Sequence, residues 1–340
     1  MAGIVDVAAA AGVTVGTVSR VLNGDPTVRV RPETRERIHA AARAANYTPN
    51  RAARALRRAR LGTLALAVHD VSNPVYAAVI AGAQQAASRH GYVLLLADVP
   101  ELARDGATFG RVVNSGIVDG LLLLPAGVEA DRQVAEQAAG IVPTVIVNDS
   151  ADALGSVTLD NEAAARMATE HLIGLGHRHI GLLALDGDTE RGYARTRGWE
   201  AAMRAAGLPV NEHWRRGGGH TAEAGRQAMG VVLDRADRPT AVLAASVLAA
   251  VGAVAAARDR GLEVPADLSV VGFHDVFFAQ YLQPGLTVVE LPLHALGERS
   301  VELLIRLLDH GEPEHVVITE PAPRIVVRGT TARHRPPAPG

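Results

Sequence analysis

Between Leu61 and Thr331, short apolar runs alternate with longer segments whose apolar residues have helical spacing. The runs predicted to be strands are Leu64–Val68, Tyr92–Ala97, Gly120–Leu124, Thr144–Val147, Ser156–Leu159, Ile180–Leu185, Thr240–Ala244 and Ser269–Gly272. Helices are predicted at Tyr76–His90, Asn161–Leu175, Ala194–Ala206, Ala222–Arg235 and Leu248–Arg260. Nearly continuous apolar strands that alternate with helices are typical of parallel sheets covered on both faces. Because the strands are too many for one compact sheet, we expect an α/β fold of two doubly wound parallel-sheet lobes, with a ligand pocket in the cleft between them.

Composition and charge restrict the function. The chain contains no Cys, which excludes disulfides, Cys-ligated metal sites and a Cys nucleophile. All 34 basic residues are Arg, whose planar guanidinium suits phosphates and base edges. Residues 1–60 hold eleven Arg against four acidic residues, a formal charge of +7, although the whole chain carries -2. A basic head on an acidic body indicates a polyanionic partner for the head, with a merely solvated charged face as the alternative.

No segment predicts membrane association. The uncharged stretch Ala241–Ala257 is rich in Ala and shorter than the roughly 20 strongly apolar residues that a membrane span needs. Residues 1–16 carry Asp6 and lack the basic region of a signal peptide. We therefore expect a cytoplasmic protein.

The first 46 residues predict a small all-α unit of three helices. Gly12 tolerates a positive φ and separates the first helix from the second, which Thr14 can cap. A third helix is predicted at Glu33–Asn46. The residues expected to pack together are Val5, Ala8, Ala9, Val18, Val21, Leu22, Ile38 and Ala41.

The first two of these helices predict a helix-turn-helix, and the outer face of the second helix fits a DNA major groove. Arg20 can donate both of its forked N–H groups to guanine, and Val15 can contact a thymine methyl group. The candidate DNA-contacting residues of this unit are Thr14, Val15, Gly16, Thr17, Ser19, Arg20 and Asn23.

The segment that follows, PNRAARALRR, predicts a helix capped by Asn50 that is too short to be stable unless it is docked. On DNA, Leu56 can wedge between base steps in the minor groove while the flanking Arg side chains hold phosphates. The alternative is a solvated, Arg-rich linker. The candidate DNA-contacting residues here are Asn50, Arg51, Ala53, Arg54, Leu56 and Arg57.

The chain resembles the LacI family of bacterial transcriptional regulators in segments spread over its whole length: IVDVAAAAGVTVGTVSRVLNG, NYTPNRAARAL, the SNP after the first strand, VTLDNEAAARMATEHLIGLGHRHIG, RTRGW, LSVVGFHD and IVVRGTT. The resemblance implies a DNA-binding headpiece, a hinge helix that inserts into the operator centre, and a periplasmic-binding-protein-like core that holds a small effector. The expected domains are a headpiece (1–48), a hinge helix (49–60), an N-terminal lobe (61–159 and 290–320) and a C-terminal lobe (160–289 and 321–331). The Pro-rich tail, 332–340, is expected to be disordered.

Polar residues at the ends of the predicted strands, together with the resemblance, indicate the effector pocket. The candidate effector-binding residues are Asn73, Tyr76, Asn148, Arg195, His220, Ser246 and His274, and Asp149 and Asp275 also follow strands. Arg195 matches a position where the family commonly places an effector-contacting Arg. Relatives that bind sugars usually have Asn-Asp in place of Ser246-Val247 and commonly Asp in place of His274. Because these acceptors are absent here, our hypothesis is an anionic effector such as a sugar acid or sugar phosphate, with a neutral carbohydrate as the open alternative.

We expect no catalytic residue, no metal site and no cofactor. The sequence has no GxSxG, no GxGxxG after a strand, and no Lys-Ser/Thr after Gly217–Gly219. His177 and His179 lie between a helix end and a strand, where hydrogen bonding or solvent exposure is a simpler interpretation than a metal pair. The favoured function is a ligand-responsive transcriptional regulator that binds a pseudo-palindromic operator on the nucleoid as a homodimer. Of the two directions of regulation, we favour repression. A solute-binding module and a metabolic enzyme are the alternatives.

Overall fold

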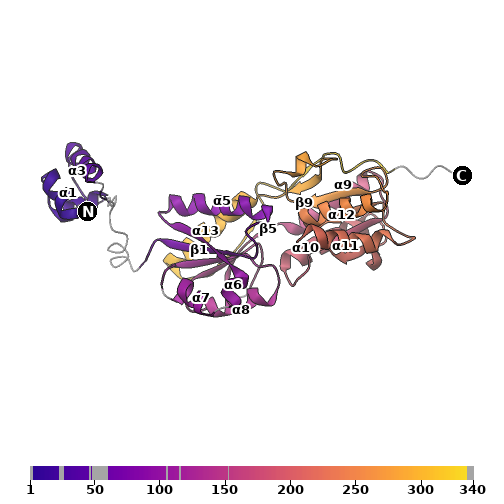
Figure 1. The fold of residues 1–340 in the computed structure, drawn as a ribbon, viewed down its shortest axis with the longest axis horizontal. Coiled ribbons are helices and arrows are strands. Elements are labelled where there is room, and N and C mark those ends of the chain that lie inside the picture. The colour runs from indigo at the N-terminus through magenta and orange to yellow at the C-terminus, as the bar shows by residue number, and fades with distance from the viewer. Residues whose placement is uncertain are drawn as a thin grey trace. The chain divides into compact units, whose positions relative to one another are not determined.

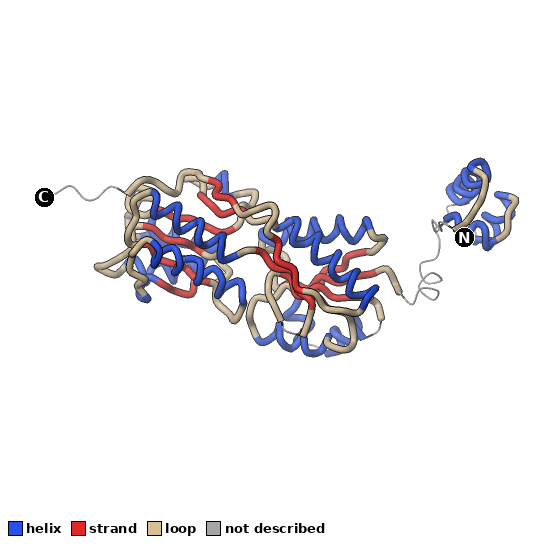
Figure 2. The backbone as a smooth tube through the Cα atoms, turned by 180° about the vertical axis from the view of Figure 1, so that it is seen from behind, coloured by secondary structure: helices blue, strands red, loops and turns tan. Residues whose placement is uncertain are grey.

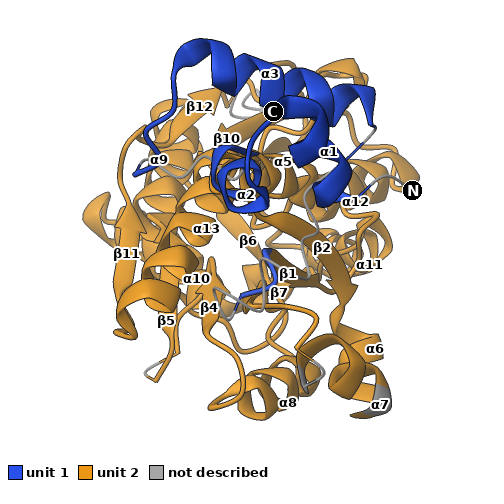
Figure 3. Cartoon of the chain, turned by 90° about the vertical axis from the view of Figure 1, so that its left-hand side faces the viewer, with its two compact units in different colours: residues 1–62 blue, residues 63–340 orange. Residues whose placement is uncertain are grey.

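The computed structural model describes residues 3–22, 27–45, 47, 60–104, 106–114, 116–151 and 153–334. It divides into two compact units, residues 1–62 and 63–340, which Figure 3 colours separately. No single helix in the described ranges is long and apolar enough to span a membrane, and one pair, α1 with α2, meets the length and composition criteria only together, across a bend of 101°.

The first unit contains helices α1 (Ile4–Ala11), α2 (Val15–Leu22) and α3 (Pro32–Ala44). Gly12 ends α1 in the left-handed conformation at φ 64°, and the Thr14 hydroxyl accepts a hydrogen bond from the Thr17 amide at 3.2 Å, which caps α2 as expected. The buried core consists of Val7, Ala8, Ala11, Val18, Val21, Val28, Ile38 and Ala42.

Part of the expected packing in this unit is wrong. Val5 is 65% exposed and Ala9 is also exposed, while Val7 and Ala11 occupy the core in their place. In α3 the expected Ala41 does pack against this core, half-buried, beside the buried Ala42. The four consecutive Ala residues of α1 carry no signal of size or polarity, so contact with both α2 and α3 decides which face is buried.

The second unit contains two six-stranded sheets, in agreement with the two predicted lobes (Figure 1). The first sheet has the order β11-β5-β4-β3-β1-β2, with β1 (Thr63–Val68), β2 (Val93–Asp98), β3 (Gly120–Leu123), β4 (Thr144–Val147), β5 (Gly155–Leu159) and β11 (His315–Ile318). The second has the order β12-β10-β9-β8-β6-β7, with β6 (Ile180–Ala184), β7 (Arg215–Gly217), β8 (Ala241–Ala244), β9 (Ser269–Phe273), β10 (Thr287–Glu290) and β12 (Arg324–Val326). All pairings are parallel except that of β10 with β12.

Helices cover both faces of each sheet. The first sheet packs against α5 (Pro74–Arg89) and α13 (Leu293–His310) on one face and α6 (Val99–Arg104), α7 (Gly106–Phe109) and α8 (Glu129–Ala138) on the other. The second packs against α9 (Asn161–Gly174) and α10 (Glu190–Ala205) on one face and α11 (Ala222–Leu233) and α12 (Val247–Asp259) on the other. Short turns of helix lie at Gly110–Asn114, Glu212–Trp214 and Ala279–Tyr281. Leu64 and Leu66 of β1 therefore enter one core while Ala65 enters the other.

The chain passes between the lobes three times, at β5 to α9, β10 to α13 and β11 to β12. Leu159 pairs with Ile318 at the first lobe, and Glu290 pairs with Arg324 at the second, so these connections lie side by side (Figure 2).

The end of the described chain differs from the expected disordered tail. The Ala332 amide donates to the Ser269 hydroxyl at 3.1 Å, and the Ala332 carbonyl lies 3.2 Å from Nε2 of His177. The His334 amide donates to the Leu175 carbonyl at 2.9 Å. Polar groups buried at the base of the second lobe therefore hold Ala332 and His334, and residues 335–340 lie outside the described part.

Close glycine contacts allow pairs of helices to pack on the sheets. A Cβ on Gly198 of α10 would overlap the Glu162 carbonyl oxygen of α9, and one on Gly297 of α13 would overlap the Val79 carbonyl oxygen of α5. A Cβ on Gly252 of α12 would likewise overlap the carbonyl oxygen of Ala222, at the start of α11. Backbone-to-backbone contact therefore sets the separation of each pair.

We expect Gly198→Ala to lower the free energy of unfolding by about 1–3 kcal/mol, because the added methyl group forces α9 and α10 apart. Gly174→Ala is the matched control, since nothing lies within 4 Å of a Cβ there. Because Ala has less backbone freedom than Gly in the unfolded chain, the free energy of unfolding of this control should rise by about 0.5–1 kcal/mol. Urea unfolding of both variants measures the difference, and equal stability of the Gly198 variant and the parent would contradict the close-packing account.

Candidate functional site

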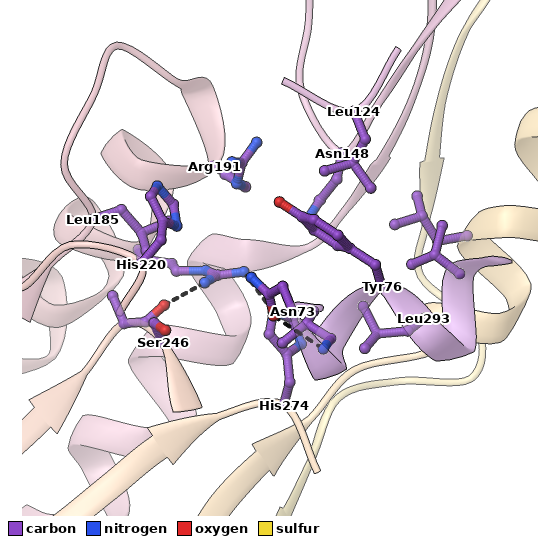
Figure 4. Close-up of a pocket in the computed structure, with 15 residues that line it drawn as sticks. Asn73, Tyr76, Leu124, Asn148, Leu185, Arg191, His220, Ser246, His274 and Leu293 are labelled. Carbon is purple, nitrogen blue, oxygen red and sulfur yellow. Dashed lines mark hydrogen bonds between the residues drawn. The ribbon is translucent and has the colours of Figure 1, made fainter. Parts of the chain in front are cut away.

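A cavity of about 50 Å³ lies between the lobes at the carboxyl ends of the strands. All seven predicted pocket residues line it: Asn73, Tyr76, Asn148, Arg195, His220, Ser246 and His274. Figure 4 shows Tyr76 and Asn148 of the first lobe opposite His220 and Arg191 of the second, with the Tyr76 hydroxyl pointing toward Arg191. The structure thus brings the candidate residues together, whereas Asp149 and Asp275 do not line the cavity.

Arg195 is buried beneath the cavity, with 2% of its surface exposed. Its Nε and Nη2 both donate to Oδ1 of Asn161, at 3.0 and 2.8 Å, and Nη1 donates to the Ala245 carbonyl. The guanidinium carbon lies 4.2 Å from the ring centroid of Phe273, a cation–π contact. Burial, and secondly the charge of Arg191, hold the pKa of Arg195 well below its usual value. All of its hydrogen-bond acceptors in the described structure are neutral.

Arg191 also lines the cavity and was not among the predicted residues. It lies one helical turn before Arg195 on α10, so the RGYAR spacing places both guanidinium groups on one face. Its Nη2 donates to the Pro125 carbonyl of the first lobe at 2.7 Å, and its Nη1 lies 3.9 Å from Oδ2 of Asp149. Nη1 is buried and has no hydrogen-bond partner. Arg191 therefore joins the two lobes and keeps donor capacity at the cavity.

Two neutral histidines complete the polar lining. Nε2 of His274 lies 3.1 Å from Nη2 of Arg195. Because guanidinium only donates, Nε2 accepts, and the proton of the neutral ring is on Nδ1, which is buried without a partner. Burial, followed by the charges of Arg195 and Arg191, holds the pKa of His274 well below its usual value.

In His220 the nitrogen without a partner is an acceptor, whereas in His274 it is a donor. Burial and then the nearby Arg191 lower the pKa of His220, although a hydrogen bond with the backbone of Asp186 acts in the other direction. Its Nε2 is buried and has no partner. Since the hydrogen bond to the Asp186 carbonyl uses Nδ1–H, Nε2 of the neutral ring keeps a free lone pair.

Backbone strain in the described residues is concentrated at this cavity. Outside glycine, only Asn148, at φ 57°, and His274, at φ 74°, have positive φ there. Each follows the end of a buried strand, and the unusual backbone turns its side chain into the pocket lining.

The two lobes are also in direct backbone contact beside the cavity. The Asp188 amide donates to the Gly127 carbonyl at 3.0 Å, and the Glu190 amide donates to Oδ1 of Asp149 at 2.8 Å. Gly127 and Gly187 both have positive φ, and a Cβ on either would lie under 3 Å from the backbone of the opposite lobe. Only residues without a side chain allow the lobes to approach this closely.

Four of the predicted DNA-contacting residues are exposed at the start and on the outer face of α2. Val15 is 41% exposed, and Thr14, Gly16 and Arg20 are also exposed. Thr17 is half-buried beside Thr14, and its hydroxyl lies 2.9 Å from that of Thr14. The placement of Ser19 on the exposed face is wrong, because only 9% of it is exposed where α2 packs against the other helices. The following predicted residues lie outside the described ranges: Asn23, Asn50, Arg51, Ala53, Arg54, Leu56 and Arg57.

Within the described ranges, no group of three or more His, Asp or Glu side chains is arranged to hold a metal ion. His177, one of the two histidines of the pair considered from sequence, is buried and lies 2.9 Å from the Thr240 hydroxyl and 3.0 Å from the Ser269 hydroxyl. These contacts make it part of the packing of the second lobe.

Comparison with known proteins gives matches over nearly the whole chain. The family model of bacterial regulatory proteins, lacI family, matches residues 3–50, and that of the periplasmic binding protein-like domain matches residues 169–331. The HTH-type transcriptional repressor CytR of Escherichia coli (strain K12) is 34% identical over 314 residues, which cover 92% of this chain and 90% of that protein. The HTH-type transcriptional regulator CelR of Thermobifida fusca is 36% identical over 326 residues, with 92% and 94% covered.

Solved structures agree with these matches. The lac repressor dimer bound to operator and the anti-inducer ONPF has a TM-score of 0.76 at 28% identity, with 97% of this chain and 99% of that chain covered. The CelR–cellobiose complex has a TM-score of 0.71 at 33% identity, with 97% and 100% covered.

We expect the free energy of unfolding to fall as the pH is lowered from about 7.5 to 5.5. Burial lowers the pKa of His171, His177, His220 and His274 in the folded state, so the unfolded chain binds more protons in this range. Each such group contributes up to about 1.4 kcal/mol per pH unit between its folded and unfolded pKa values. Urea unfolding as a function of pH measures the slope. His177→Gln should flatten it, and an undiminished slope in that variant would argue against a contribution from His177.

Proposed function

This chain belongs to the LacI family of bacterial regulatory proteins, and from that premise we propose that it is a repressor that binds a pseudo-palindromic operator as a homodimer under the control of a small effector. It is a DNA-binding transcriptional regulator. The observation that carries the proposal is a helix-turn-helix with Arg20 exposed on its second helix, in the same chain as a two-lobed core with a polar cavity. Its proposed place of action is the bacterial cytoplasm, on the nucleoid.

Apolar side chains on the surface of the core support the homodimer. Strand β2 is at the edge of the first sheet, where Val93, Leu95 and Leu96 are 38%, 40% and 45% exposed. In the second lobe Phe277 is 77% exposed and Tyr281 is 73% exposed. Apolar surface on both lobes is suited to a second copy of the chain, and two-fold symmetry would match a palindromic operator.

The proposed effector is a carbohydrate or carbohydrate derivative bound in the cavity between the lobes. The solved structure of the relative CelR is a complex with cellobiose. An effector that contacts both lobes stabilises the closed arrangement and changes operator affinity by a coupling free energy of typically 1–3 kcal/mol. The proposed element that responds is the hinge segment 49–60, which we expect to be ordered only when it is paired and docked on DNA.

The operator is found by selection from a random duplex library with the purified full-length chain, and two inverted half-sites are expected. On the selected site, Arg20→Ala should weaken binding about tenfold or more, since one base-reading guanidinium contributes roughly 1–3 kcal/mol. Arg178→Ala is the matched control, because it removes the same charge from an exposed site on the second lobe. Fluorescence anisotropy measures the operator affinity of both variants. An equal loss of affinity would mean that Arg20 contributes only through its charge and does not read a base.

For the hinge segment, we expect Leu56→Ala to reduce operator bending, because the minor-groove wedge is shortened. Gel mobility of circularly permuted operator fragments measures the bend. Arg54→Ala and Arg57→Ala serve for comparison: each should lower the salt dependence of binding by about one phosphate contact and leave the bend unchanged. Unchanged bending in the Leu56 variant would remove the wedge from the mechanism.

A further inference from the structure

We propose that the effector is a small hydroxycarboxylic acid, a sugar acid with one negative charge, whose carboxylate accepts hydrogen bonds from Arg191 and His274 beside the charge of Arg195 and whose hydroxyl donates to His220. This inference rests on the proposed function, because it assigns the ligand of the regulatory pocket. It is carried by the charges and the unused hydrogen-bonding atoms of the cavity.

Two cations line the cavity, and in the described part of the chain only one of them has an ion-pair partner behind the lining. Two of the lining residues are Arg, and none is Asp or Glu. Asp149, behind the lining, lies 3.9 Å from Arg191, whereas no ion pair to Arg195 occurs among the described residues. A buried charge without a counter-ion is costly, and a ligand with one negative charge supplies what is missing.

The histidines do not alter this charge balance. Nε2 of His274 accepts from Arg195, so the ring is neutral where it contacts the cation. His220 is buried and lies near Arg191 (Figure 4), and burial, followed by this charge, lowers its pKa. A single negative charge on the ligand is therefore sufficient, and a phosphate with about two negative charges exceeds the requirement.

The unpartnered atoms show which groups the ligand must carry. Nη1 of Arg191 and Nδ1–H of His274 are buried donors without acceptors, and Nε2 of His220 is a buried acceptor without a donor. A carboxylate only accepts hydrogen bonds, so it can satisfy the two donors but not His220. A hydroxyl group on the same molecule supplies the remaining donor.

The walls of the cavity fit a short polyhydroxylated carbon chain or ring. Leu124, Leu185 and Leu293 give apolar walls for the C–H faces, and Tyr76 adds an aromatic surface. A carboxylate also matches the planar, forked donors of Arg.

The test measures binding to the unmodified full-length protein by thermal unfolding and then by titration calorimetry. The probes are C4 to C7 aldonic and uronic acids, including gluconate and galacturonate, each beside its neutral sugar or alditol and its sugar phosphate. We expect at least one acid to bind at least 30-fold more tightly than its neutral counterpart and more tightly than the phosphate. Equal binding of acid and neutral sugar, tighter binding of the phosphate, or no stabilisation by any acid would overturn the proposal.

Two variants locate the effect. Arg195→Gln should reduce the acid-to-neutral preference at least tenfold, whereas Arg197→Gln, an exposed residue of the same helix whose ion pairs are with Glu162 and Glu190, should leave it unchanged. Equal preference in both variants would count against the assigned site. If the Arg195 variant does not fold, the comparison of acids with neutral sugars on the parent protein still decides.

Operator selection on the same protein separates this inference from the proposed function. Sequence-specific DNA binding together with a neutral-sugar effector would overturn only the assignment of the ligand. Acid binding by a protein that selects no operator would support the ligand assignment and overturn the regulatory function.

Discussion

Two guanidinium groups, one helical turn apart on α10, are buried at the boundary of the two lobes, and much of the pocket is arranged around them. Arg191 reaches the Pro125 carbonyl of the first lobe, and Arg195 engages Asn161 and the Ala245 carbonyl. Burial, followed by these two charges, lowers the pKa of His274 and His220, and the hydrogen bond from Arg195 makes Nε2 of His274 the acceptor. The chemistry of the cavity thus depends on a pair of cations that the protein itself only partly neutralises.

Most of the core fold could be predicted from the sequence because parallel strands buried on both faces are continuous in apolar residues. Strands β7, β10, β11 and β12 were not assigned. β7 and β12 are three residues long and include Arg, so they carry no such pattern, whereas β10 and β11 each contain two adjacent Val residues. Helix α13 was not assigned although its apolar residues recur at helical spacing, so that signal was available. In α1 the run of Ala hid the buried face, and only contacts with α2 and α3 resolve it.

Strand ends, together with the family resemblance that indicated Arg195, predicted the pocket well, because the topology of parallel sheets brings the strand ends to one edge. Arg191 was missed although it precedes Arg195 by four residues, a spacing that places the two on one helix face. The backbone contacts of Gly127 and Gly187 could not be predicted, because they depend on how two separate lobes meet. Ser19 was misplaced for a related reason, since its burial comes from packing between helices and not from the pattern of α2 alone.

The three connections between the lobes have a mechanical consequence. A single connection would let the second lobe rotate in any direction relative to the first. Three adjacent connections, joined by the pairing of Leu159 with Ile318 and of Glu290 with Arg324, resist torsion and shear. Hinge bending of one lobe relative to the other, about the axis through the three connections, is the motion that remains easy. The two lobes of the core therefore move about a single hinge axis. Ligands of different shape can be reported as one coordinate, the angle between the lobes.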